Sequence, residues 1–89
     1  MTINLKPLIK SGIPKYLAIS EALEQVIANG DLQAGTQLPT HRELAEQLDV
    51  SVQTVSNAYA HAEKKGVVEA WVGSGTFVSN YQVDKETEF

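Results

Sequence analysis

The sequence predicts an α+β fold of the winged helix-turn-helix class, in which three helices precede a two-stranded β-hairpin. Apolar residues recur at spacings of three and four up to residue 65, as they do along one side of a helix. Residue types that begin and end helices divide this region into three segments. Two β-branched and aromatic runs then flank Gly-Ser-Gly, which is typical of a hairpin.

The composition fits one small domain without catalytic or metal chemistry. At 89 residues, of which 43% are apolar and 20% charged, the chain suffices for one modest core. It has no cysteine, which excludes disulfides, thiolate metal sites and a thiol nucleophile. His41 and His61 cannot complete a metal site alone, and no nucleophile and base pair is visible. We therefore expect neither an enzyme nor a metal site.

The first residues predict a location and an arm. Residues 1–19 lack the unbroken apolar run of a signal peptide or membrane span, so we expect a cytoplasmic protein without membrane contact. Residues 1–13 show no sustained period and contain Pro7 and Gly12, which favours an N-terminal arm. The domain itself is expected over residues 14–78.

The first helix is expected over residues 14–29. Pro14 suits its first turn, and Gly30 suits its C-terminal end. The apolar stripe that would face the core consists of Tyr16, Ile19, Leu23 and Val26. Residues 31–39 are rich in turn-forming types and leave room only for a very short strand near 36–38.

Two capping signals place the second and third helices. Thr40 and Glu43 have the spacing of a capping box, so the second helix should begin there and end before residues 49–50. Ser51 then offers an N-cap for a third helix over residues 52–65. The apolar stripe of that helix is Val52, Val55, Tyr59 and Ala62, and the residues on the opposite side are Gln53, Asn57 and Lys64.

The Gly-Ser-Gly step allows two interpretations, a phosphate-binding loop or a hairpin turn. A phosphate loop needs a helix directly after it, and no helical pattern follows Gly75. We therefore predict strands over 67–72 and 76–78, with Trp71 and Phe77 as core aromatics. The polar residues 79–89 are predicted to be an acidic tail or linker.

The outward side of the third helix carries side chains suited to reading DNA. Amide groups present a donor and an acceptor together and match adenine in the major groove, although a solvated polar surface is an equally ordinary explanation. The net charge of −4 argues against a polyanion partner. Glu21, Glu24 and Asp31 belong to the first helix and its exit, however, and these could face away from DNA.

Residues 34–78 resemble the winged-helix DNA-binding domain of GntR-type bacterial transcription regulators. The motifs that carry the resemblance are G-T-x-L-P-T, R-E-L-A, V-S-x-x-T-V-x-x-A-Y, K-G-V-V and G-S-G-T-F-V, in that order. Together with YLAISEALEQVIANG at residues 16–30, the resemblance covers most of the chain. It implies a sequence-specific transcription regulator, with the third helix in the major groove and the hairpin wing at the minor groove.

The resemblance also implies a set of contacts to double-stranded DNA. The recognition positions fall on Ser51, Gln53, Thr54, Ser56 and Asn57, the wing positions on Gly73 and Gly75, and a phosphate contact on Arg42. Surface pairing with Glu46 is the alternative role of Arg42. Many relatives have arginine where this chain has Val52 and Ser56, so few cations remain on the third helix. Dimerisation or the basic arm with its three lysines (Lys6, Lys10 and Lys15) would have to add affinity, and a homodimer is expected on DNA.

YLAISEAL and VQTVSNAYAHAE resemble the MocR-like branch of the family, in which this domain is joined to an aminotransferase-like domain. Pyridoxal phosphate would belong to that fused domain, and no cofactor is expected in the present 89 residues. A different class of function remains open, since the acidic balance favours a winged helix that binds another protein through the same surface.

Overall fold

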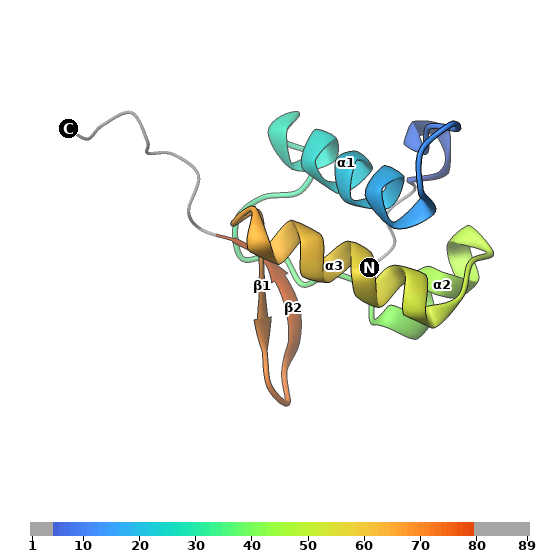
Figure 1. The fold of residues 1–89 in the computed structure, drawn as a ribbon. Coiled ribbons are helices and arrows are strands. Elements are labelled where there is room, and N and C mark those ends of the chain that lie inside the picture. Colours follow the sequence, from blue (N-terminus) through green and yellow to red (C-terminus); the bar gives the residue numbers. More distant parts are fainter. Residues whose placement is uncertain (1–4, 80–89) are drawn as a thin grey trace.

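Three helices and one hairpin follow one another in the predicted order (Figure 1). The computed structural model describes residues 5–79. The elements are the 3-10 helix η1 (Lys6–Leu8), α1 (Lys15–Ala28), α2 (His41–Leu48), α3 (Val52–Lys64), β1 (Val68–Trp71) and β2 (Gly75–Val78). This arrangement confirms the winged helix-turn-helix prediction, and the helix ends differ from the predicted ones by one residue at most.

Local hydrogen bonds explain where α2 begins and ends. The Thr40 hydroxyl accepts from the Glu43 backbone N–H, and the Glu43 carboxylate accepts from the Thr40 backbone N–H, each at 3.0 Å. This is the predicted capping box. Asp49 adopts a left-handed conformation with φ of 59°, which ends α2 and turns the chain towards α3.

The core lies mainly between α1 and α3, with α2 and the hairpin closing its ends. Small side chains are buried on both long helices, and they allow close approach: Ala18, Ala22, Ala58 and Ala62. Larger apolar side chains fill the remaining space, among them Ile19, Leu23, Leu44, Val55 and Val68. Since α3 is covered on one side by these contacts, its other side is left to solvent.

Tyr59 ties α3 to the segment that precedes α2. Its side chain is buried, and its hydroxyl donates a 2.8 Å hydrogen bond to the Pro39 carbonyl oxygen. Burial raises the pKa of Tyr59, and the nearby charge of Glu43 raises it further. The hydrogen bond therefore links α3 directly to the segment that leads into α2.

Leu5 belongs to the core, although it lies within the segment predicted to be an arm. Its side chain is fully buried, and Leu8 and Ile9 pack against the same cluster. A single 3-10 turn gives no helical period, so the apolar pattern could not indicate this packing. The predicted division of the chain after residue 13 stays a prediction, and residues 80–89 of the predicted tail lie outside the described residues.

The hairpin is antiparallel, and a strip of chain before α2 lies along its second strand. Val68 pairs with Val78 and Trp71 with Gly75. On the other edge of β2, Gln37 forms an isolated bridge with Phe77, and the Leu38 N–H donates to the Thr76 carbonyl oxygen at 2.8 Å. The very short strand predicted near 36–38 is therefore this bridge.

The prediction that Trp71 and Phe77 are core aromatics is wrong. Trp71 is 58% exposed, and Phe77 is half-buried and lies outside the core cluster. Side chains alternate between the two faces of a strand, and the face that holds Val68 and Val78 is the buried one. A two-stranded ribbon has only one packed face here, so Trp71 lies on the outer face.

Within residues 5–79, every helix is too short or too polar to cross a lipid bilayer.

Replacing Leu5 by alanine is expected to lower the free energy of unfolding by about 2 kcal/mol, because a fully buried leucine leaves a cavity. Urea denaturation followed by circular dichroism would measure the loss. Lys6→Ala is the matched control, since Lys6 is exposed beside Leu5. Equal stability of the Leu5 variant and the control would contradict the packing of this segment.

Candidate nucleic-acid interface

The side of α3 that faces away from α1 is the candidate interface. In Figure 1, α1 lies above α3, and the hairpin projects downward from the C-terminal end of α3, away from α1. The outward side chains of Gln53, Asn57, Ala60 and Lys64 are exposed. The protein therefore leaves uncovered a polar helix side that is bordered at one end by a protruding ribbon.

Gln53 and Asn57 form one amide unit on this side. The side-chain nitrogen of Gln53 donates to Oδ1 of Asn57 at 3.0 Å, one helical turn away. This bond leaves the Gln53 side-chain oxygen as an acceptor and the Asn57 side-chain nitrogen as a donor towards an approaching ligand. The pair thus presents both hydrogen-bonding types at a fixed separation.

Ser51 and Thr54 are engaged in starting α3. The Ser51 hydroxyl accepts from the Thr54 backbone N–H at 3.1 Å, and the two hydroxyl oxygens lie 2.8 Å apart. Ser51 is thus the predicted N-cap. Both residues sit at the exposed N-terminal end of α3, where a hydroxyl can serve the helix and a ligand together.

Ser56 and Ala60 both border the groove between α3 and the hairpin, but they differ in exposure: Ser56 is half-buried and Ala60 is exposed. Ser56 is half-buried and lines a groove of about 170 Å³ between α3 and the hairpin, together with His41 and Thr76. The structure therefore does not bring Ser56 onto the centre of the amide surface. Ala60 is exposed between the groove and the amide pair, and the sequence did not indicate it because a methyl group offers no recognition chemistry of its own. Its small size lets a ligand approach the helix backbone.

Arg42 stands at the second position of α2 and is exposed. The suggested pairing with Glu46 is not formed: among residues 5–79, the ion pairs join Lys10 to Glu21 and Lys65 to Glu24. The Arg42 guanidinium is therefore available beside the N-terminal end of α2, whose backbone N–H groups also favour an anion. The predicted phosphate role is consistent with this position.

The two predicted wing glycines shape the tip of the hairpin. Gly73 and Gly75 have φ angles of 82° and 119°, which side-chain-bearing residues rarely adopt. The Ser74 N–H donates to the Trp71 carbonyl oxygen at 2.9 Å and closes the turn. Steric crowding also favours glycine at position 75, since a Cβ there would lie 3.0 Å from the side-chain nitrogen of Gln37.

Gln37 contributes to the candidate interface, although no sequence motif indicated it. Its side-chain nitrogen donates to the Ser74 carbonyl oxygen at 3.0 Å. This bond ties the tip of the hairpin to the segment that leads into α2. The position of the tip relative to the helix-turn-helix is thereby fixed by a side chain as well as by the strand pairing.

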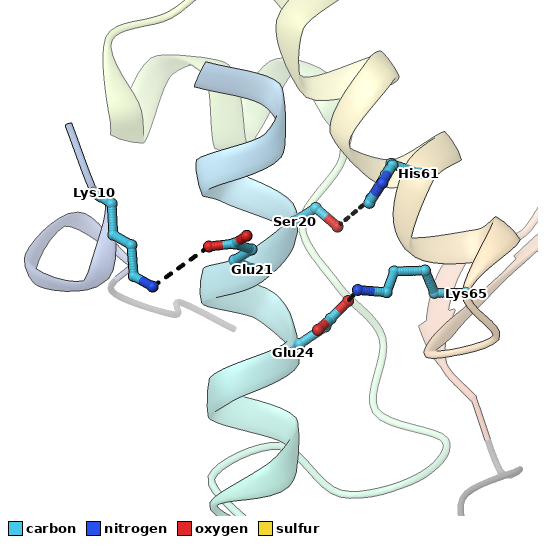
Figure 2. Close-up of polar contacts among 6 residues, drawn as sticks. All are labelled: Lys10, Ser20, Glu21, Glu24, His61 and Lys65. Carbon is cyan, nitrogen blue, oxygen red and sulfur yellow. Dashed lines mark hydrogen bonds and ion pairs between the residues drawn. The ribbon is translucent and has the colours of Figure 1, made fainter. Parts of the chain in front are cut away.

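Both acidic residues of α1, Glu21 and Glu24, take part in ion pairs. Lys65 Nζ lies 2.6 Å from Glu24 Oε2, and Lys10 Nζ lies 3.5 Å from Glu21 Oε1; both pairs are drawn in Figure 2. In the same view, the Ser20 hydroxyl and Nδ1 of His61 lie 3.0 Å apart and link α1 to α3. Lys65 thus serves the helix pair, which leaves Lys64 as the lysine of the outward surface of α3.

Comparison with known proteins places these features in a family. A family model described as bacterial regulatory proteins, gntR family, matches residues 15–78. The chain is 53% identical over 78 residues to the uncharacterized HTH-type transcriptional regulator YdeF of Bacillus subtilis (strain 168), covering 86% of this chain and 17% of that regulator. It is 40% identical over 76 residues to the HTH-type transcriptional repressor NagR of the same organism, covering 85% of this chain and 31% of that repressor.

A solved structure with bound DNA has the same fold. The chain matches the AraR DNA-binding domain in complex with operator ORX1 with a TM-score of 0.72 and 31% identity, covering 75% of this chain and 81% of that chain. The present chain spans less than a third of the length of YdeF and of NagR. The chain therefore matches only one segment of each regulator. The residues that the structure describes form a winged helix.

Replacing Ser51 by alanine is expected to lower the free energy of unfolding by about 1 kcal/mol, because the Thr54 N–H loses its cap. Thermal unfolding in the absence of DNA would measure this. Ser56→Ala is the control, since Ser56 caps no helix. A Ser51 variant as stable as the control would show that the cap contributes nothing.

Proposed function

The chain belongs to the GntR family of bacterial regulatory proteins, and from that membership we propose that it is the sequence-specific DNA-binding domain of a transcription regulator. The observation that carries this proposal is the uncovered amide side of α3 beside the protruding hairpin. A helix of this diameter fits the major groove of B-form DNA, where each base pair presents a distinct hydrogen-bonding pattern.

In this proposal, Gln53 and Asn57 read base edges. Their mutual hydrogen bond fixes the orientation of both amides before DNA arrives, which reduces the entropy lost on binding. The remaining acceptor and donor match the N6 and N7 groups of adenine. Ser51 and Thr54 contribute hydroxyls at the end of α3 that enters the groove first, and Ser56 contacts DNA from the wing side.

Arg42 and the wing hold the domain in register. The Arg42 guanidinium and the N-terminal end of α2 bind a backbone phosphate, a contact that positions the protein without reading sequence. Gly73 and Gly75 carry the hairpin tip into the adjacent minor groove, where the missing side chains let the backbone approach closely.

The small number of free cations leads us to propose that the protein binds DNA as a homodimer. With Lys65 paired to Glu24 and Lys10 to Glu21, few phosphate contacts remain for a single copy. Counterion release then contributes little to the affinity. A second copy on an adjacent half-site adds its binding energy at high effective concentration.

We further propose that the domain works in the cytoplasm as part of a MocR-like regulator, joined to an aminotransferase-like domain that holds pyridoxal phosphate. Support comes from the segments YLAISEAL and VQTVSNAYAHAE. The length of YdeF is also compatible, because the matched 78 residues make up only 17% of that regulator.

A protein-binding winged helix is the second candidate, and the net charge of −4 favours it. Such a module would present the same side of α3 to another polypeptide. Competition between duplex DNA and that polypeptide for α3 would distinguish the two functions.

Replacing both Gln53 and Asn57 by alanine is expected to relax base preference, with a loss of about 1 to 3 kcal/mol for the preferred duplex and little for random duplexes. Fluorescence anisotropy with both duplexes measures this. Gln25→Ala, an exposed glutamine on α1, is the control. An unchanged ratio between preferred and random duplexes would refute major-groove reading by this pair.

Replacing Arg42 by alanine is expected to weaken binding to all duplexes alike, and to lower the slope of log affinity against log salt by about one. Titrations at several salt concentrations would measure the slope. Arg42→Lys is the matched variant, because it keeps the charge and should keep most of the slope. An Arg42→Ala variant with the wild-type slope would rule out the phosphate contact.

A further inference from the structure

The tip of the wing is apolar and lacks cations. Val72 is fully exposed, and its neighbour Trp71 is 58% exposed. Between Lys65 and Ser79 the only charged residue is Glu69. Single exposed apolar residues are common on protein surfaces, but here two large ones are adjacent at the end of a protruding ribbon.

Hydrogen bonds also hold the tip of the hairpin in a defined position. The Ser74 backbone accepts from the Gln37 side chain at 3.0 Å and donates to the Trp71 carbonyl oxygen at 2.9 Å. The adjoining Gly73 and Gly75 hold positive φ angles. Val72 is therefore presented from a fixed turn, at a set position relative to α3.

A ribbon without lysine or arginine cannot gain from phosphate contacts through counterion release. The carboxylate of Glu69 would repel a DNA phosphate. This residue lies at the base of the hairpin, however, and its carboxylate accepts a hydrogen bond from the Ser79 hydroxyl. The apolar surfaces that DNA offers are the deoxyribose walls of the minor groove and the faces of its base steps. Aliphatic side chains bind to both in other minor-groove proteins.

We propose that Val72 is a specificity-determining residue that inserts into the minor groove and favours A·T pairs at the wing position. This inference rests on the proposed function, in which the wing lies at the minor groove beside the site of α3. The physical basis is steric, because the N2 amino group of guanine protrudes from the floor of the minor groove at every G·C pair. A branched aliphatic side chain fits where that group is absent.

Inosine separates this steric effect from base reading in the major groove. An inosine·cytosine pair lacks the minor-groove amino group and keeps the major-groove pattern of G·C. The test uses a duplex that the full chain selects from a random-sequence pool. The pair beneath the wing, located by hydroxyl-radical protection, is then made A·T, G·C or inosine·C.

Wild-type protein is expected to bind the A·T and inosine·C duplexes equally, and the G·C duplex about five- to tenfold more weakly. Val72→Ser should bind all three with similar affinity, at about the level of wild type on G·C. Its salt slope should equal that of the wild type, because no ionic contact is lost. Val72→Ile is the matched variant, since its side chain stays branched and aliphatic, and it should keep the wild-type order.

Trp71 supplies a readout that does not depend on affinity. It is the only tryptophan in the chain and adjoins Val72, so its fluorescence reports on the wing. Acrylamide quenching should fall when the A·T or inosine·C duplex is bound at saturation, and fall less with G·C. Unchanged quenching on all duplexes would place the wing in solvent and overturn the inference.

The outcomes also separate this inference from the proposed function. Selection of no duplex from the pool would count against DNA binding itself. Tight binding with inosine·C behaving like G·C would leave DNA binding intact and remove the role of Val72, as would a Val72→Ser variant that keeps the preference for A·T.

Discussion

The packing of α1 against α3 is the constraint on which the candidate interface depends. Ala18 and Ala22 on α1 and Ala58 and Ala62 on α3 are buried and small, so the two helices approach closely. The hydrogen bond between Ser20 and His61 adds a polar link inside this contact. Because one side of α3 is packed against α1, the opposite side of α3 is left exposed to solvent. The placement of the amides of Gln53 and Asn57 follows from this packing.

A second constraint sets the wing relative to α3. The strip around Gln37 and Leu38 bonds to β2, Tyr59 on α3 bonds to Pro39, and Thr40 starts α2. One short segment therefore connects the hairpin, α3 and the N-terminal end of α2. In the proposed complex, α3, the hairpin and α2 would contact DNA together, and a shared support would keep their relative positions constant.

Sequence reasoning predicted the features that depend on local chemistry. The capping box at Thr40 and the glycines of the hairpin have strong local signals, and the elements that they delimit agree with the structure. It failed where tertiary contacts decide the outcome. Leu5 joins the core through a turn too short to have a period, and the outer position of Trp71 follows from a ribbon packed on one face only. The ion pair between Lys65 and Glu24 could not be inferred from sequence spacing, because 41 positions separate the two residues.

The distribution of charge explains how an acidic domain could bind DNA selectively. Lys10 and Lys65 are paired with carboxylates of α1 and are less available for phosphate contacts, which would keep non-specific attraction to DNA weak. In the proposed complex, base and shape contacts made by the amide pair and the apolar wing tip would form a larger share of the total binding energy. Weak non-specific binding also reduces competition from the many non-cognate sites of a genome, which raises discrimination at a given affinity. Such a domain would have low affinity as a single copy, and the proposed second copy would restore the affinity without lowering the discrimination.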